Sequence, residues 1–447
     1  MTSTVRRAGA FAAVATLAFA APVATGIDSA ALATVAATGP FALVALLAVT
    51  VVDQDSVLFE LFARPGDYED GKLYGLAAFS LAAAGLALLA VRFDLPVWVF
   101  VGVVVLVAYG NLGQRVAVRI KSDEVVGAAG FVVTGFATGV AAQLGAARIQ
   151  SVAVAPADAL FLAGTGALVA ALLRSVLFER DDPLVMLSVG LLLWLFFELD
   201  PTVAPQRVFV ALGVSAALGY VAYALDTASL PGMLTGVLLS LLTIVLGGYG
   251  WFAMLITFFG LGGLSTKYRY EEKADRGIAE ENEGARGSGN VLANSIVALV
   301  AVLAWAASPS HIAVDPALFL YAFAGAVAAA MTDTFSSEFG GLYDNPRLIT
   351  TFERVEPGTD GGVTWQGVVA GLVGAAIIAG IAAVTIARVG TAGAALVCAC
   401  GLVGMFVDSV LGATVEGTVV GNQGVNTLAT LAAAVTGVGV ALAVGLV

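Results

Sequence analysis

The sequence has 447 residues, of which 60% are hydrophobic and only 12% are charged. Soluble domains are about 45–50% apolar and about 25% charged, so this composition excludes a soluble globular protein and indicates a polytopic membrane protein. The net charge is −12, and only four residues are lysines. Acidic, lysine-poor loops are typical of the hydrated surfaces of halophilic proteins, and we expect a halophilic, archaeal source. An acidic bacterial protein is the alternative.

Apolar runs long enough to cross a bilayer recur along the whole chain. They predict an all-α, multi-pass protein with about fifteen transmembrane helices, each of roughly 17–25 residues. In chain order the expected spans are 6–25, 31–52, 73–91, 96–110, 124–146, 153–173, 184–199, 208–225, 231–247, 249–263, 291–308, 312–332, 365–387, 390–411 and 425–446.

The basic residues indicate which loops face the cytoplasm, because Lys and Arg are enriched on that side of a membrane. With Arg6 and Arg7 placed inside, the N-terminus is cytoplasmic, and alternation brings all four lysines and all the polar motifs to the same side. We therefore expect a protein of the cell membrane whose active site faces the cytoplasm. The predicted inner loops are 53–72, 111–123, 174–183, 226–230, 264–290, 333–364 and 412–424.

The two parts of the chain differ in the chemistry that they carry. We expect residues 1–190 to form an N-terminal membrane domain and residues 191–447 to form a second membrane domain with most of the polar motifs. Both parts contain a loop with Gly and acidic residues, followed by a Gly turn into a new span. One interpretation is a divergent duplication with a degenerate, kinase-like first half, and the other is a first half without catalysis.

Acidic residues interrupt the apolar sequence at 332–340, 356–364 and 408–416. Carboxylates in or beside transmembrane segments are rare unless they meet an ion, a substrate or water. Mg²⁺ usually takes one or two carboxylates together with substrate phosphates. The candidate metal ligands are Asp333, Glu338, Asp408 and Glu416. Helix capping is the alternative role for the first two.

Residues suited to phosphate binding surround these carboxylates. Backbone amides of a Gly-rich turn approach phosphate closely, although the turn 357–362 could also serve only to reverse the chain. Lys and Arg neutralise phosphoryl oxygens, and Asn can orient them. The candidates are Lys267, Lys273, Asn294, Arg354, Gly358, Thr359, Gly361, Gly362, Asn422 and Asn426. Because the sequence has no P-loop and no protein-kinase motif, any phosphoryl transfer requires another scaffold.

As a set, these motifs resemble the transmembrane family that includes the plant phytyl-phosphate kinase of the vitamin E pathway. The resemblance covers about residues 190–447, with Arg354 where the family usually has Lys. Its segments are Phe258-Phe259, Thr266-Lys267, Lys273, Val291-Leu-Ala-Asn294, Asp333-Thr-Phe-Ser-Ser-Glu338-Phe-Gly340, Leu348-Ile-Thr-Thr351, Val355-Glu-Pro-Gly-Thr-Asp-Gly-Gly362, Asp408-Ser-Val-Leu-Gly412, Asn422 and Asn426. The first half, at Tyr109-Gly-Asn-Leu-Gly-Gln-Arg115 and Lys121-Ser-Asp-Glu124, weakly resembles CTP-dependent polyprenol kinases, with Asn111 where they have an acidic residue.

The resemblance implies an integral membrane kinase. It would transfer a phosphoryl group from a nucleoside triphosphate, with CTP the favoured donor, to phytyl- or geranylgeranyl-phosphate. Asp333, Glu338 and Asp408 would then hold Mg²⁺ and act in catalysis together with Lys267. Lys273 and the 357–362 loop would bind phosphates, and the three asparagines would orient them. The expected partners are a membrane lipid substrate and a nucleotide, with no nucleic acid, and a homo-oligomer is left open.

Two other functions are compatible with the same residues. A polyprenol kinase or lipid cytidylyltransferase would use the same metal site on a different acceptor. A secondary transporter would suit the number of spans and an internal repeat. Such a transporter should place its ionisable residues near the middle of the bilayer, whereas here they lie at the ends of the expected helices, which favours the kinase.

Overall fold

The computed structural model describes residues 4–177, 182–201, 203–225, 229–279, 288–308 and 310–447. It confirms an all-α membrane fold, and among these residues fourteen helices are long and apolar enough to cross a bilayer. The expected span at 184–199 corresponds to α10 (Asp182–Glu198), which at 17 residues is shorter than those fourteen. Every predicted span therefore coincides with a helix.

The chain divides into two compact units, which comprise Met1–Glu198 with Val203–Val208 and Leu199–Thr202 with Phe209–Val447. The predicted boundary at residue 190 falls inside α10, because a change in motif content does not mark where packing ends. In unit 1 the helices before α10 are α1 (Thr4–Ala15), η1 (Thr16–Phe19), α2 (Ala20–Ala24), α3 (Ala30–Thr50), α4 (Val57–Phe62), α5 (Pro65–Asp70), α6 (Tyr74–Arg92), α7 (Val97–Ile120), α8 (Glu124–Ile149) and α9 (Pro156–Val176).

Helix α7 forms the core of unit 1 and packs closely on α8. An added Cβ at Gly113 would lie 2.5 Å from the carbonyl oxygen of Gly130. Small residues at such positions let transmembrane helices approach closely enough for extensive dispersion contacts. The sequence predicted a short span that ends at residue 110 and a loop at 111–123, but the helix continues to Ile120. Hydropathy detects the apolar part of a helix, and polar residues such as Asn111 and Arg115 do not end its backbone.

Unit 2 contains the remaining helices and a short hairpin in which Arg347 pairs with Val363 and Leu348 with Gly362, antiparallel. Its elements are α11 (Pro205–Leu225, beginning just before the unit boundary), α12 (Leu230–Leu242), η3 (Thr243–Gly247), α13 (Tyr249–Lys267), α14 (Tyr270–Asp275), α15 (Ser288–Ala307), α16 (Ala317–Gly340), β1 (Arg347–Leu348), β2 (Gly362–Val363), α17 (Trp365–Thr385), α18 (Gly390–Thr414) and α19 (Asn422–Ala443).

Helix α16 is the central helix of unit 2, and 83% of its most apolar stretch is buried. It contacts α13, α15, α17, α18 and α19. Small residues make these contacts close, since an added Cβ at Gly404 of α18 would lie 2.3 Å from the Ala329 Cβ of α16. The predicted span ended at residue 332, yet the helix runs to Gly340 and includes Asp333 and Glu338.

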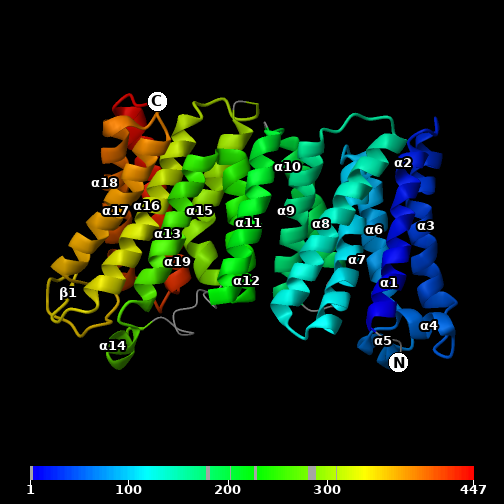
Figure 1. The fold of residues 1–447 in the computed structure, drawn as a ribbon, viewed down its shortest axis with the longest axis horizontal. Coiled ribbons are helices and arrows are strands. Elements are labelled where there is room, and N and C mark those ends of the chain that lie inside the picture. The colour runs from blue at the N-terminus through cyan, green and yellow to red at the C-terminus, as the bar shows by residue number, and fades with distance from the viewer. Residues whose placement is uncertain (1–3, 178–181, 202, 226–228, 280–287, 309) are drawn as a thin grey trace. The chain divides into compact units, whose positions relative to one another are not determined.

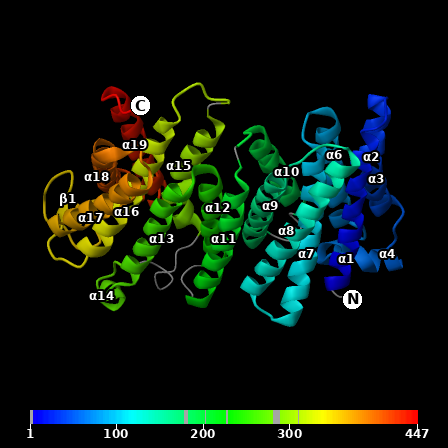
Figure 2. The same cartoon turned by 45° about the horizontal axis from the view of Figure 1, so that its top comes forward.

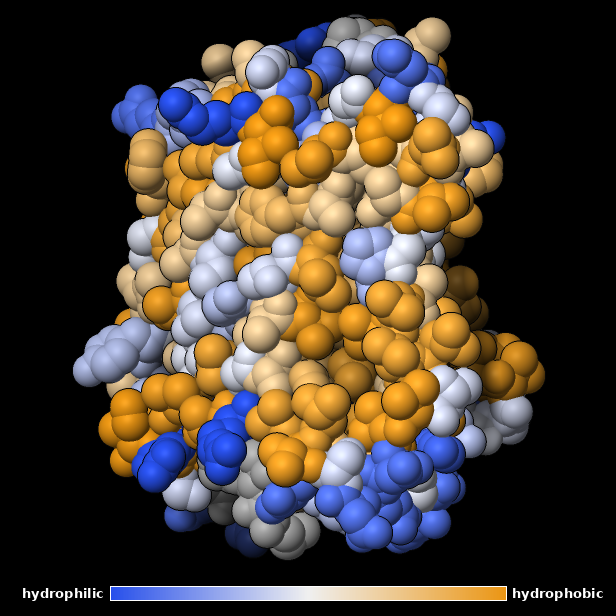
Figure 3. Space-filling model, turned by 90° about the vertical axis from the view of Figure 1, so that its right-hand side faces the viewer, coloured by the Kyte–Doolittle hydropathy of each residue, from blue (hydrophilic) through white to orange (hydrophobic). Residues whose placement is uncertain are grey.

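Within unit 2, the turn around α14, the β-hairpin and the start of α19 lie at one end, and the C-terminus lies at the other (Figures 1 and 2). The described residues 264–279 and the predicted inner loops 333–364 and 412–424 therefore lie at one end of its bundle. Figure 3 shows one face of unit 1, where an apolar band separates polar residues at top and bottom. Leu32, Val35 and Leu43 of α3 are 55–64% exposed, as expected for side chains in contact with lipid tails.

We predict that Gly404→Ala destabilises unit 2, because the new methyl group would force α18 away from α16. Overpacking of this kind costs about 1–3 kcal/mol. The matched control is Gly380→Ala on α17, where an added Cβ meets nothing within 4 Å. Thermal unfolding in detergent should show a lower melting temperature for Gly404→Ala only. Equal melting temperatures for both variants would contradict close packing of α16 and α18.

Candidate functional site

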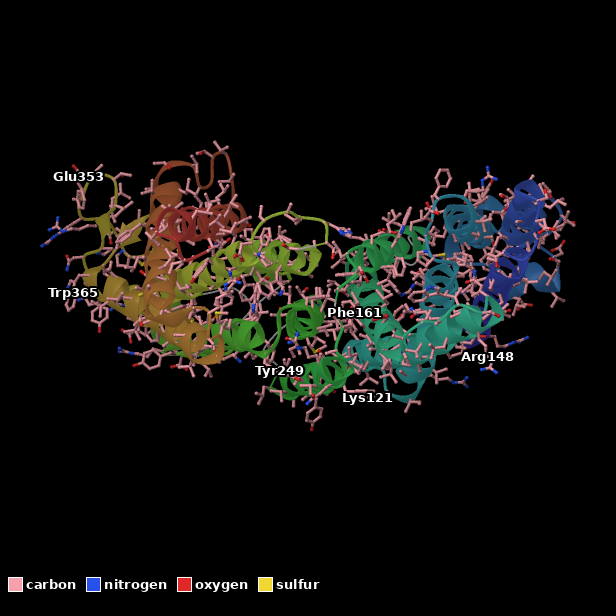
Figure 4. The ribbon with its side chains drawn as sticks, turned by 90° about the horizontal axis from the view of Figure 1, so that it is seen from above. Lys121, Arg148, Phe161, Tyr249, Glu353 and Trp365 are labelled. Carbon is pink, nitrogen blue, oxygen red and sulfur yellow. The ribbon has the colours of Figure 1, made fainter. Side chains whose placement is uncertain are left out.

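The predicted site residues come from helix ends and turns that meet at one end of unit 2. Figure 4 shows Glu353 at the outer tip of the hairpin and Trp365 at the first residue of α17. The chain enters α17 through Thr364, whose hydroxyl accepts a hydrogen bond from the Gly367 amide at 3.1 Å and donates one to the Gly340 carbonyl at 3.3 Å. This cap fixes the end of α16 against the start of α17.

Asp333 of α16 and Asp408 of α18 form a carboxyl pair, joined by a side-chain hydrogen bond. Asp408 Oδ2 is buried and has no hydrogen-bond partner. Asp333 lies seven residues before the end of α16 and Asp408 six before the end of α18. Since two adjacent carboxylates repel each other, a shared proton or a cation must offset their charge. The unpartnered Asp408 oxygen and the hard oxygen donors of both carboxyl groups are suited to Mg²⁺.

The Gly-rich turn packs directly against the last turns of α18. Gly361 has φ +75°, and an added Cβ would lie 2.6 Å from the Ser409 carbonyl oxygen and 2.5 Å from the Ala413 Cβ. Only glycine tolerates both that dihedral angle and that contact. Gly358 also has a positive φ, of +84°. The predicted phosphate-binding turn therefore lies beside the helix that carries Asp408.

Hydrogen bonds within the turn fix its shape. The Thr359 hydroxyl donates to the Glu356 carbonyl at 2.7 Å, and the Gly362 amide donates to the Thr359 carbonyl at 2.9 Å. The Gly361 carbonyl accepts from the Ile349 amide at 3.0 Å, which ties the turn to the hairpin. These hydrogen bonds give the turn a defined backbone conformation.

Glu416 follows α18 and reaches back toward its last turn. Its Oε2 atom lies 3.4 Å from the position of an added Cβ at Gly412. Burial raises the pKa of the Glu416 carboxyl, and the nearby Asp360 raises it further. Glu416 therefore lies beside the Gly-rich turn and adds negative charge to this end of the unit.

The four predicted metal ligands do not converge on one point. No group of three or more His, Cys, Asp or Glu side chains suited to a metal ion occurs among the described residues. Instead, Glu338 accepts a hydrogen bond from Lys273 Nζ at 2.5 Å, and their side chains are 9% and 1% exposed. The donor set that the structure brings together is the pair Asp333 and Asp408.

Lys273 has all three of its protons occupied by protein acceptors. Besides Glu338, its ammonium donates to the carbonyls of Ser265 at 2.9 Å and Thr266 at 2.7 Å, at the end of α13. A lysine has only three donors, so the phosphate-binding role predicted for Lys273 disagrees with this geometry. The pair instead joins α13, α14 and α16, and it takes Glu338 away from the predicted metal site.

Asn422 and Asn426 lie in the first turns of α19, and Asn294 lies in the second turn of α15. Asn294 Nδ2 donates to the Asn290 carbonyl and side-chain oxygens at 3.1 Å, and Asn426 Nδ2 donates to Asn422 Oδ1 at 2.9 Å. The two helix ends touch, because an added Cβ at Gly289 would lie 2.5 Å from Gln423 Nε2, and one turn later the Thr427 hydroxyl donates to the Ala293 carbonyl at 3.2 Å. Helix N-termini carry partial positive charge and favour anions.

The two remaining predicted cations are exposed. Lys267 is the last residue of α13, and Arg354 lies in the hairpin. Arg354 and Thr359 line an open cavity of about 600 Å³ together with Asp344, Asn345, Val355, Glu356 and Pro357. Its volume suits a ligand the size of a nucleotide.

Comparison with known proteins identifies the family. The family model described as integral membrane protein DUF92 matches residues 213–440, from α11 to α19. The chain belongs to this family. A membrane protein of Methanocaldococcus jannaschii, described as uncharacterized, is 32% identical over 254 residues, which cover 54% of this chain and 97% of that protein.

Two plant relatives of this DUF92 protein come from Arabidopsis thaliana. Protein VTE6, chloroplastic, is 30% identical over 154 residues, which are 34% of this chain and 46% of that protein. Protein PGR is 30% identical over 234 residues, which are 48% of this chain and 81% of that protein. The family expected from the motifs is thereby confirmed. No solved structure matches the chain.

Sequence reasoning missed several residues at this end of the DUF92 unit. Asp344 and Asn345 line the cavity, and Asp360 faces Glu416. The sequence could have indicated these residues, because they lie in polar loops beside the predicted motifs. The partnership of Lys273 with Glu338 had no such signal, because the two residues are 65 positions apart and only folding brings them together.

We predict that Lys273→Met strongly destabilises this DUF92 protein. Removing one partner of a buried ion pair leaves an uncompensated charge and costs about 3–5 kcal/mol. Lys267→Met removes an exposed lysine and should leave the melting temperature unchanged. Thermal unfolding in detergent measures both. A Lys273→Met variant as stable as the parent would show that the buried pair contributes little.

The raised pKa of Glu416 predicts a pH-dependent stability difference. The folded protein holds this proton more tightly than the unfolded chain, so stability falls as pH rises from the ordinary glutamate pKa of about 4.3 through the raised folded value. Glu416→Gln should therefore be more stable than the parent at pH 8 and equally stable at pH 4. Thermal unfolding of parent and variant at both pH values, with EDTA present, tests this prediction. Glu353→Gln serves as a control at an exposed position. An equal difference at both pH values would contradict it.

Proposed function

We propose that this protein is a membrane phosphotransferase that transfers a phosphoryl group from a nucleoside triphosphate, with CTP the favoured donor, to a prenyl monophosphate. The proposal rests on the Asp333–Asp408 pair. One oxygen of Asp408 has no hydrogen-bond partner, and the helix that carries Asp408 packs against the Gly-rich turn. The resemblance of the motifs to the family of the plant phytyl-phosphate kinase supports the same reaction, as does the 30% identity to Protein VTE6, chloroplastic, over 46% of that protein.

With two carboxyl groups, the pair is suited to binding a single divalent cation. Asp333 and Asp408 would hold Mg²⁺, which completes its shell with phosphate oxygens and water. Bound there, Mg²⁺ would neutralise charge on the phosphates of the nucleotide. Lys273 and Glu338 have no part in this proposal, because they bind each other.

The protein groups around the pair are suited to holding phosphates. The Gly-rich turn presents backbone at a fixed distance from α18, and Lys267 and Arg354 supply exposed positive charge. The N-termini of α15 and α19, which meet at Gly289 and Gln423, add two positive dipole ends. Such groups act by positioning and by electrostatic stabilisation, which are the main contributions that a protein makes to phosphoryl transfer.

In the proposed reaction, an oxygen of the acceptor monophosphate attacks the terminal phosphorus of the nucleotide. A new P–O bond forms while the bond from that phosphorus to the bridging oxygen breaks, and the nucleoside diphosphate leaves. The product is a prenyl diphosphate. Because the acceptor phosphate is already an anion, this step needs no general base to remove a proton.

A lipid acceptor suits the helix that carries Asp408. Phe406 and Val410 of α18 are 39% and 42% exposed, so the face of this helix opposite Asp408 is apolar and open to lipid. The phosphate would then reach the pair while its prenyl chain stays in the bilayer. We further propose that this end of unit 2 faces the cytoplasm, because Lys267, Arg276, Arg347 and Arg354 lie there.

A direct assay combines purified protein, Mg²⁺, labelled CTP or ATP, and geranyl-, geranylgeranyl- or phytyl-phosphate. We expect labelled prenyl diphosphate with at least one of these pairs. Absence of diphosphate with every pair, from protein that elutes as a folded species, would overturn the kinase proposal. Incorporation of the cytidylyl group instead would indicate a lipid cytidylyltransferase.

Asp333→Asn and Asp408→Asn should each lower turnover by about 10²–10³-fold, the loss typical when one electrostatic contact to the reacting groups is removed. Both variants should keep the melting temperature of the parent or exceed it, since each removes repulsion within the pair. Asp315→Asn is the control, because Asp315 pairs with Arg388 at 2.6 Å at the other end of unit 2. Equal activity losses in all three variants would argue against a site at the pair.

A further inference from the structure

Residues 270–279, which contain α14 and the turn after it, lie at the same end of unit 2 as the hairpin (Figure 1). We call them the α14 segment. Lys273 anchors this segment, because its buried ammonium donates to Glu338 of α16 and to two carbonyls at the end of α13. The start of the α14 segment is therefore fixed against two transmembrane helices.

The turn at the end of α14 sets the direction of Ile278. The Gly277 amide donates to the Ala274 carbonyl at 3.0 Å, and the Ile278 amide donates to the Lys273 carbonyl at 3.0 Å. These two bonds form a Schellman motif, in which Gly277 adopts the left-handed conformation with φ +71°. The motif reverses the chain at Gly277, and the side chain of Ile278 then points back toward the candidate site.

Ile278 packs against two glycines at once. Its Cδ1 atom lies 2.7 Å from the position of an added Cβ at Gly341, directly after α16. Its Cγ2 atom lies 2.7 Å from the position of an added Cβ at Gly358, in the Gly-rich turn. Neither glycine could carry a side chain without displacing Ile278. The turn is thus contacted by Ile278 at Gly358 and by α18 at Gly361.

The α14 segment also reaches the other wall of the open cavity beside the turn. Arg276 Nη1 donates to Asp344 Oδ1 at 2.9 Å, and Asp344 lines that cavity. The residues on either side of Gly358 line it as well. Because an exposed ion pair stabilises little, we expect the apolar contact of Ile278 to be the stronger of the two.

The position of the turn matters because phosphate recognition depends on geometry. A displacement of about 1 Å can slow a reaction about 100-fold. We propose that Ile278 is a positioning residue for the donor nucleotide, because it holds the Gly-rich turn in place at Gly358. This inference rests on the proposed transfer from a nucleoside triphosphate. The prenyl phosphate approaches from the bilayer in that reaction, so its affinity should not depend on Ile278.

Three substitutions of Ile278 separate positioning from stability. Ile278→Ala removes both contacts. Ile278→Val loses Cδ1 but keeps the Cγ2 methyl that meets Gly358, whereas Ile278→Leu keeps the volume but has no Cγ2 methyl. Volume-conserving apolar exchanges are tolerated best, so we expect Ile278→Leu to fold. The control is Ile120→Ala, at an isoleucine of unit 1 that is 83% exposed.

Hydrogen exchange of the purified full-length protein in detergent measures the turn without requiring catalysis. The Thr359 amide donates to the Glu356 carbonyl and the Gly362 amide donates to the Thr359 carbonyl, so both should be protected in the parent. In Ile278→Ala and Ile278→Leu, we expect these amides to exchange at least about tenfold faster, and in Ile278→Val and Ile120→Ala at the parent rate. Unchanged exchange in Ile278→Ala overturns this inference and leaves the proposed function standing.

Steady-state kinetics with CTP or ATP and a prenyl phosphate tests the link to the donor. Ile278→Ala and Ile278→Leu should raise the KM for the nucleotide at least about tenfold and leave the KM for the prenyl phosphate unchanged. Ile278→Val should restore the parent value. Equal increases in both KM values, or a larger effect of Ile278→Val than of Ile278→Leu, overturn the inference. A parent that is inactive with every substrate pair overturns the proposed function, and the role toward the donor with it.

Discussion

An uncompensated charge inside a transmembrane bundle is too costly to persist, and much of this structure follows from that constraint. Lys273 and Glu338 satisfy it with each other, and they join α13, α14 and α16 in doing so. Asp333 and Asp408 satisfy it only with a proton or cation between them. In unit 1, Asp182 pairs with Arg64 and Arg174. The Lys273–Glu338 pair is complete within the protein, whereas the carboxyl pair needs a proton or a ligand to balance its charge.

The helical framework could be predicted from sequence because hydropathy measures the property that selects membrane helices. The same signal misplaced several helix ends. It stopped at residue 110 in α7 and at residue 332 in α16, since polar residues lower hydropathy without breaking a backbone helix. This error assigned Asp333 and Glu338 to a loop. Their place inside a helix is what turns one of them toward α18 and the other toward Lys273.

The residues of the site were easier to predict from sequence than the contacts between them. The sequence indicated Asp333, Asp408 and the Gly-rich turn, because acidic residues and clustered glycines are rare in apolar sequence for physical reasons. It also grouped Glu338 with the metal ligands and Lys273 with the phosphate-binding residues. Charge alone could not separate these roles, since the partner of each residue depends on how α14 folds back against α16. The ion pairs of Asp182 with Arg64 and Arg174 in unit 1 had no signal in the sequence, because the three residues lie in separate segments.

The contact between Gly361 and α18 links two parts of the molecule that would serve different substrates. Backbone touches backbone there, so no flexible side chain can absorb a displacement. Any tilt of α18 moves the turn, and through the bond from Ile349 it also moves the hairpin. In the proposed reaction, a lipid that displaced α18 from the bilayer side would therefore change the shape of the nucleotide side. By reciprocity, the affinity for each proposed ligand would depend on occupancy by the other, so the two binding equilibria would be thermodynamically coupled.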